Sequence, residues 1–140
     1  MKYRKSIRLK NYNYANNGFY FVTICTAMRK PLFEIYKSGA EKLLLALPER
    51  FNGVKIDYYK FGKEHLHVIF IFDNANVRLG QVIRTYKALV TKTTGHKNFW
   101  EWNYYEHIIR NEKALYNIRK YIDEHPLKEE INWKEIYGEK

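Results

Sequence analysis

The chain has 140 residues, a length that suits one domain with a single hydrophobic core. Its 25 Lys and Arg outnumber its 15 Asp and Glu, so the net charge is +10, and 13 tyrosines raise the aromatic content to 17%. No run approaches the roughly 18 apolar residues of a membrane span, no signal-type segment follows the basic N-terminus, and the single Cys25 excludes an intrachain disulfide. We therefore expect a cytoplasmic protein. Charge and aromatic rings favour a nucleic-acid partner, with an anionic membrane surface or no particular partner as alternatives.

The first predicted elements follow a basic arm, residues 1–17. Residues 19–27, "FYFVTICTA", are rich in aromatic and β-branched side chains, which is typical of a buried strand. Pro31 interrupts the chain after this strand. A helix is expected to begin near Ser38 and to end or kink at Pro48, because proline cannot donate a backbone hydrogen bond.

The middle of the chain predicts a hairpin. Strands over 54–61 and 65–72 are joined by the short connection 62–64, which favours antiparallel pairing. The second strand is apolar on both faces, which is typical of a strand in the interior of a sheet.

The second half of the chain predicts two helices and one strand. An apolar stripe at helical spacing indicates a helix over 78–94, and a strand is expected over 104–110. Asn111 can cap a third helix over 112–125, which ends at Pro126.

The element order β-α-β-β-α-β, followed by a helix, predicts an α+β fold. It is the ferredoxin-like split βαβ pattern, an antiparallel sheet with helices mainly on one face, here with a C-terminal helix that carries a tyrosine. The tail, 127–140, is charged, with one short helix expected around Trp133 and Ile136. We expect a single domain over 1–140.

Two histidines stand at the start of the strand over 65–72. His65 and His67 are two residues apart, so their side chains point to the same face of a strand. Such a pair is either half of a metal site or an incidental feature of a polar strand end. A third ligand must come from elsewhere. His125, at the end of the third helix, follows Tyr121 by four residues and shares its helix face. If that face looks at the histidine strand, the three imidazoles form a metal site beside Tyr121.

Simpler roles are open for both helix residues. Tyr121 borders the apolar stripe of its helix, where a tyrosine often serves only for packing. His125 can act as a C-terminal cap that the helix dipole favours.

Five stretches of the chain carry a resemblance. The histidine pair at the start of a central strand, followed by a tyrosine on a late helix, resembles the HUH single-tyrosine transposases, in particular the REP-associated subgroup. The similar stretches, in order over roughly residues 15 to 128, are "FYFVTICTAMRKPLF", "EHLHVIF", "LGQVIRTYKALVTK", "FWEWNYYEHIIRNEKAL" and "IRKYIDEHP".

The resemblance implies a metal-dependent single-stranded DNA endonuclease and strand transferase that cuts near hairpins. Tyr121 is then the nucleophile and forms a 5′-phosphotyrosine intermediate, while His65 and His67 bind Mg²⁺ or Mn²⁺. The family's third ligand lies four residues after the tyrosine and is usually an amide, whereas here that position is His125. The family's Met-Pro-Asn approach to the histidines is also replaced, by "FGKEHLH".

Basic residues are the candidates for DNA contacts, because together they can neutralise phosphates, although each alone could be a solvated surface charge. The candidates are Arg84, Lys87, Arg110, Lys113, Arg119 and Lys120, with Arg4 and Lys5 of the arm. The expected partner is single-stranded DNA with hairpins. A monomer is favoured, and a homodimer is possible.

Two other functions fit the same residues. The fold could bind structured DNA or RNA without cutting it, which predicts salt-sensitive binding and no covalent product. The histidines could also serve a zinc or manganese hydrolase of small substrates, with Tyr121 as a bystander.

Overall fold

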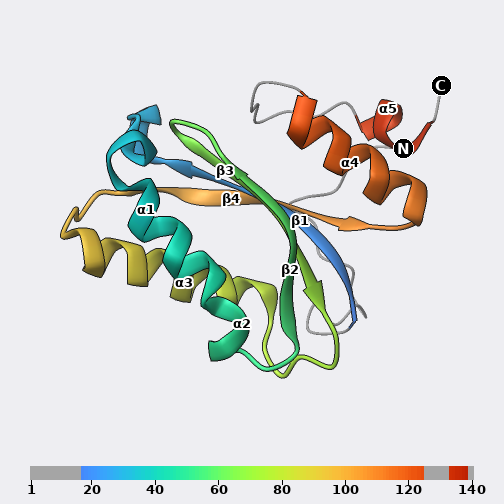
Figure 1. Cartoon of the computed structure of the whole chain (residues 1–140), viewed down its shortest axis with the longest axis horizontal. Coiled ribbons are helices and arrows are strands. Elements are labelled where there is room, and N and C mark those ends of the chain that lie inside the picture. The colour runs from blue at the N-terminus through green and yellow to red at the C-terminus, as the bar shows by residue number, and fades with distance from the viewer. Residues whose placement is uncertain (1–16, 125–132, 139–140) are drawn as a thin grey trace.

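A computed structural model of the chain describes residues 17–124 and 133–138 (Figure 1). The elements, in chain order, are β1 (Gly18–Thr26), the short 3-10 helix η1 (Ala27–Arg29), α1 (Leu32–Leu45), α2 (Leu47–Arg50), β2 (Val54–Phe61), β3 (His65–Phe72), α3 (Leu79–Thr94), β4 (Trp100–Ile109), α4 (Glu112–Glu124) and α5 (Trp133–Tyr137). In the described part of the chain, no helix is both long and apolar enough to span a membrane.

The described strands form one antiparallel sheet in the order β2-β3-β1-β4. β3 therefore lies inside the sheet, as its two apolar faces predicted, and β2 and β4 are the edges. In the β1–β3 register, Cys25 lies opposite His65 and Thr23 lies opposite His67. The predicted α+β fold of the split βαβ type is confirmed.

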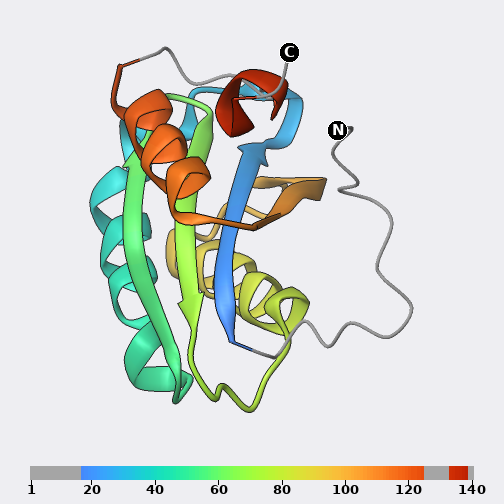
Figure 2. The ribbon, with the colours of Figure 1, turned by 90° about the vertical axis from the view of Figure 1, so that its right-hand side faces the viewer.

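Helices cover both faces of the sheet. α1 and α3 share one face, over a core that includes Tyr20, Phe70 and Tyr86. α4 and α5 lie on the opposite face, where Phe21 and Ile69 belong to a second, smaller core (Figures 1 and 2). Alternate residues of β1 and β3 thus contribute to different cores, so the face of a residue in these two strands follows from its parity.

α1 begins earlier than the sequence predicted. The expected start near Ser38 is wrong, because the helix begins at Leu32, directly after Pro31. The first amides of a helix have no intrahelical acceptor, so a proline at this point removes no hydrogen bond. Leu32 and Phe33 are buried, and their burial favours ordering of this first turn. Pro48 lies in the first turn of α2, after α1 has ended, as expected.

β4 is longer than expected, and the tail contains the expected helix. The strand predicted over 104–110 begins at Trp100, which pairs with Thr26 across a register shift. The indole Nε1 of Trp100 also donates to the backbone oxygen of Lys87, 3.0 Å away, which ties this extension to α3. α5 contains Trp133 and Ile136, as predicted. Nearly all of the arm lies outside the described residues.

Candidate metal and tyrosine site

The two histidines lie side by side on the α4 face of the sheet. His65 and His67 have the same strand parity as Ile69, which belongs to the core under α4. Their rings are nearly parallel, with centroids 6.4 Å apart and an interplanar angle of 15°. Both residues are buried, His65 at 8% exposure and His67 at 0%.

One nitrogen of each imidazole lacks a hydrogen-bond partner within the described residues. The Nε2 atoms of His65 and His67 are buried and unpaired there. A buried polar atom without a partner is costly in free energy, so such an atom needs an explanation such as a bound ion. Nδ1 of His67 lies 2.7 Å from Oγ1 of Thr23. If Nδ1 carries the proton and donates it to Thr23, the lone pair of Nε2 is free to bind a metal.

Burial favours the neutral form of both rings. Desolvation lowers the pKa of His67 to about 3, and the nearby His65 and Lys60 act in the same direction. Desolvation also lowers the pKa of His65, against an opposing effect from the Glu64 carboxylate. Neutral imidazole is the form that coordinates metals. The pair therefore fits two nitrogen ligands of a divalent cation.

Cys25 lies opposite His65 on β1, yet it is not in the form that binds metal. The thiol is 4% exposed, and desolvation raises its pKa to about 11. It therefore stays protonated at neutral pH. This confirms its predicted role as a small core residue.

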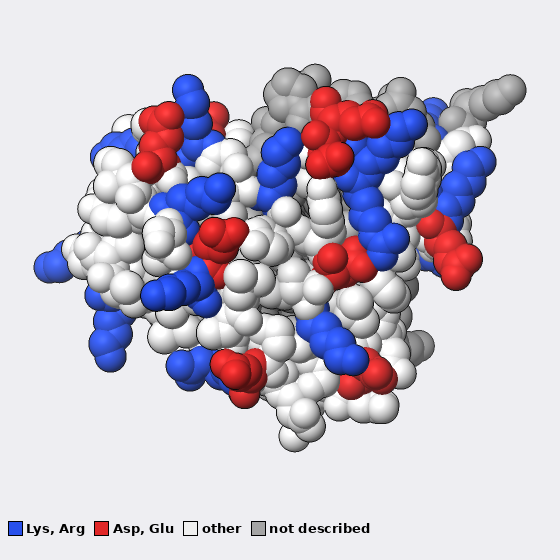
Figure 3. Space-filling model, in the orientation of Figure 1, with Lys and Arg blue, Asp and Glu red and all other residues white. Residues whose placement is uncertain are grey.

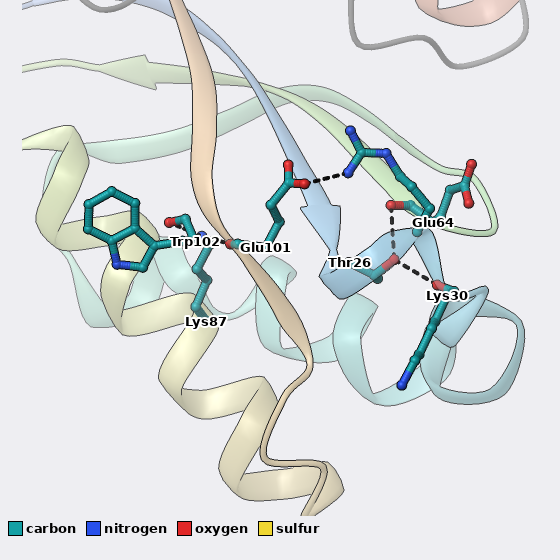
Figure 4. Close-up of polar contacts among 7 residues, drawn as sticks. Thr26, Lys30, Glu64, Lys87, Glu101 and Trp102 are labelled. Carbon is teal, nitrogen blue, oxygen red and sulfur yellow. Dashed lines mark hydrogen bonds and ion pairs between the residues drawn. The ribbon is translucent and has the colours of Figure 1, made fainter.

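The turn after β1 is anchored beside the histidine strand (Figure 4). The hydroxyl of Thr26 donates to the backbone oxygen of Lys30, 2.6 Å away, and its amide donates to the backbone oxygen of Glu64, 3.0 Å away. Arg29 pairs with Glu101 of β4 at 2.7 Å. These contacts hold η1 between β4 and the loop that leads into His65.

Tyr121 lies on the same side of the sheet as the histidine pair. It packs, half-buried, against the smaller core, in which Phe21 and Ile118 are buried. The ring of Phe21 also contacts the ring of His67, with centroids 5.3 Å apart. Tyr121 and His67 therefore both adjoin this smaller core. The prediction that Tyr121 borders the apolar stripe of its helix is confirmed.

The last turn of α4 is held to the edge strand β2. The hydroxyl of Tyr58 donates to the carboxylate of Asp123 at 2.8 Å, and Nζ of Lys60 donates to the backbone oxygen of Asp123 at 3.3 Å. Lys60 is the register partner of His67. The last turn of α4 is therefore bonded to the β2 residue that pairs with His67.

The third predicted ligand, His125, lies outside the described residues. Within the part of the chain that the structure describes, no three His, Cys, Asp or Glu side chains converge to hold a metal. The completed three-histidine site thus stays a prediction.

Two of the candidate DNA contacts, Lys87 and Arg119, donate side-chain hydrogen bonds within the protein, and the guanidinium of a third, Arg110, lies 4.0 Å from the centroid of the Tyr137 ring. Nζ of Lys87 donates to the backbone oxygens of Glu101 at 2.9 Å and Trp102 at 3.3 Å (Figure 4). The guanidinium of Arg119 forms two hydrogen bonds with Asp57, at 2.8 and 2.5 Å. Lys87 and Arg119 stay predictions as DNA contacts. To bind DNA, each would have to contact a phosphate as well as its partner within the protein.

The other basic candidates are exposed, but they are divided between the two sides of the sheet. Arg84 lies on α3, on the side away from the histidine pair, whereas Arg110 follows β4, and Lys113 and Lys120 lie on α4. Over the surface in Figure 3, positive and negative side chains are interspersed rather than gathered into one patch. Arg4 and Lys5 lie outside the described residues. The role of these cations in DNA binding stays a prediction.

Sequence reasoning missed Thr23 and Asp57. Thr23 is a buried polar residue between the buried apolar residues Val22 and Ile24, and that contrast was visible in "FYFVTICTA". Asp57 had no such signal, because its contact with Arg119 depends on which face of the sheet α4 covers.

Comparisons with known proteins place the chain next to DNA transposases in fold. No protein-family model matches the chain. A relative from Haemophilus influenzae, described only as an uncharacterized protein, is 32% identical to this chain. The alignment covers 89% of this chain and 89% of the relative. The chain belongs to the family of this Haemophilus protein.

Two solved structures share the fold. A REP-associated tyrosine transposase bound to a REP hairpin has a TM-score of 0.71 and 22% identity, over 83% of this chain and 70% of that one. A candidate transposase from Deinococcus radiodurans R1 has a TM-score of 0.56 and 15% identity, over 84% of this chain and 95% of that one. The resemblance to tyrosine transposases that the sequence motifs indicated is confirmed at the level of the fold.

Proposed function

We propose that this protein is a metal-dependent single-stranded DNA endonuclease and strand transferase that acts through Tyr121. The observation that carries the proposal is the pair of buried Nε2 atoms of His65 and His67, unpartnered among the described residues, on the sheet face that α4 covers with Tyr121. Metal-binding nitrogens and a phenol on one face are what phosphodiester transfer to a tyrosine needs. The fold shared with a REP-associated tyrosine transposase supports the same reaction class.

The reaction is a transesterification. The phenolic oxygen of Tyr121 attacks the phosphorus of a phosphodiester and loses its proton to solvent. The bond from phosphorus to the 3′ oxygen of the neighbouring nucleotide breaks, and that oxygen takes up a proton to become a free 3′-OH. The tyrosine retains the 5′-phosphate. Because one ester replaces another, a 3′-OH can attack the intermediate and rejoin a strand.

A divalent cation fits the histidine pair. His65 and His67 would supply two nitrogen ligands and His125 a third, with Mg²⁺ or Mn²⁺ as the ion. When bound, the ion would neutralise charge on the scissile phosphate and favour the ionised phenol, whose pKa in free tyrosine is about 10. Three imidazoles favour Mn²⁺ over Mg²⁺, because nitrogen donors suit later, softer metals.

Single-stranded DNA with a hairpin is the proposed substrate. The REP hairpin held by the structural neighbour and the charge of +10 on this chain support that choice. We further propose that the active form is a monomer, because α4 packs on the sheet of its own chain. A mixture of the variants Tyr121→Phe and His67→Ala should then stay inactive, whereas restored activity would indicate exchange of α4 between subunits.

The direct test is covalent capture of DNA. The wild-type chain, incubated with Mn²⁺ and single strands that contain hairpins, should form an adduct that survives denaturing electrophoresis. Tyr121→Phe and His67→Ala should each abolish the adduct. Tyr116→Phe is the matched control, because Tyr116 lies on the same helix but is 62% exposed. Salt-sensitive binding without an adduct would instead favour a DNA- or RNA-binding module, and an adduct in Tyr121→Phe would exclude this nucleophile.

A further inference from the structure

An ion pair joins the tyrosine helix to the edge of the sheet. Arg119 of α4 donates through Nε and a terminal nitrogen to the two carboxylate oxygens of Asp57 in β2, at 2.8 and 2.5 Å. Asp57 is only 12% exposed, whereas Arg119 is 42% exposed. A two-pronged contact of this kind fixes both the distance and the orientation of the partners. It therefore constrains α4 more than a single contact between flexible side chains would.

An irregularity in β2 brings two successive side chains to α4. Ile56 pairs with Phe70, and Tyr58 pairs with Ile69, so Asp57 is an extra residue in the ladder. In a regular strand, successive side chains point to opposite faces. Here the successive residues Asp57 and Tyr58 both bond to α4. Bulges of this kind redirect side chains, and they are frequent beside active sites.

The contacts from β2 lie on either side of the proposed nucleophile. Arg119 is two residues before Tyr121, and Asp123 is two residues after it. Arg119 bonds to Asp57, while Asp123 accepts hydrogen bonds from Tyr58 and Lys60. The helix segment that carries Tyr121 is thus attached to β2 at both ends, next to the strand of the histidine pair.

We propose that Asp57 is a positioning residue for Tyr121, and that it acts through Arg119 to fix the seating of α4 over the histidine face. This inference rests on the proposed function, because it assigns Asp57 to the reaction of Tyr121. Apolar packing holds α4 on the sheet, but it tolerates small shifts along and around the helix axis. The ion pair at the bulge removes that freedom where the phenol must meet the phosphate. A misplacement of about 1 Å at a reacting group can cost roughly 100-fold in rate.

The experiment compares cleavage rate, DNA affinity and helix mobility in three variants. Asp57→Asn keeps the shape of the side chain but removes the charge, and Arg119→Gln removes the other partner. The double variant tests whether the two residues act as one unit. Glu34→Gln is the matched control, because it removes a different carboxylate from an ion pair, the 3.8 Å contact with Lys63. Each chain is measured in single-turnover cleavage with Mn²⁺, in DNA binding, and in hydrogen exchange of the α4 amides.

The expected result is a loss of about tenfold or more in cleavage rate for Asp57→Asn, with DNA affinity within about twofold of wild type. The α4 amides should exchange faster, and the double variant should be no slower than the slower single variant. Glu34→Gln should match wild type in all three measurements.

Three outcomes would overturn the proposal. If the wild-type chain forms the adduct and Asp57→Asn cleaves at the same rate, Asp57 has no positioning role, while the proposed function stands. If the losses of the two single variants multiply in the double variant, Arg119 acts independently, as a direct DNA contact would. If the wild-type chain forms no adduct, the proposed function fails first, and the positioning role fails with it.

Discussion

Nδ1 of His67 and Oγ1 of Thr23 lie 2.7 Å apart, on buried residues that face each other where β3 pairs with β1. This contact leaves Nε2 as the atom of His67 that can bind a metal. Partners that orient a ligand histidine typically change metal affinity by about 10- to 100-fold when they are removed.

Thr23→Val should therefore weaken Mn²⁺ binding by about 10- to 100-fold. Thr23→Ser keeps the hydroxyl and should bind Mn²⁺ with nearly wild-type affinity. Calorimetric titration of the purified chain with Mn²⁺ measures the affinity without any need for cleavage. Equal affinity in wild type and Thr23→Val would show that the hydroxyl does not orient His67.

The free energy of unfolding should decrease as the pH decreases, because His107 is buried. Burial lowers the pKa of His107 to about 3, and the positive charge of Arg110 acts in the same direction. The unfolded chain, with a histidine pKa of about 6.5, then binds more protons than the folded chain between those two values. The free energy of unfolding is therefore highest above the unfolded pKa and decreases as the pH falls through this window.

The contribution of His107 can be isolated by substitution. Between pH 7 and pH 5, wild type should lose about 1–2 kcal/mol more than His107→Gln, which cannot take up this proton. Urea titrations at the two pH values measure the difference. The variant can be less stable at both, since Nε2 of His107 lies 2.5 Å from the hydroxyl of Tyr137. An identical pH dependence in both chains would contradict the assignment.

Cys25 should resist alkylation in the folded protein. Burial raises its pKa to about 11, and alkylating reagents react with the thiolate. We expect iodoacetamide at pH 8 to label the native thiol at least about two orders of magnitude more slowly than the thiol in urea. Mass spectrometry over time gives both rates. Fast native labelling would show that β1 opens at this position.

The sheet could be predicted from sequence where a local pattern decides the structure. The bounds of β2 and β3 agree with prediction, because a short connection between two β-rich runs specifies a hairpin. The start of α1 could not be predicted from a local sequence pattern. Pro31 looks like a helix breaker, yet it stands directly before the first helical residue, where a missing amide has no cost.

The site was only partly predictable because its residues meet through tertiary packing. Strand parity placed His65 and His67 on one face, and helix periodicity placed Tyr121 beside an apolar stripe. Neither pattern says which face of the sheet a late helix covers. The bond from Thr23 to His67 depends on the β1–β3 register, and the contact of Asp57 with Arg119 depends on which face of the sheet α4 covers, so neither was visible in one sequence.

The central claim is that Tyr121 is the residue that becomes joined to DNA. The most direct measurement is tandem mass spectrometry of the protein–DNA adduct, after digestion with trypsin and nuclease. The account predicts a nucleotide phosphate attached to Tyr121 through its 5′ end, in a product that requires a divalent metal. Attachment to any other of the 13 tyrosines, or to a residue of another type, would contradict it.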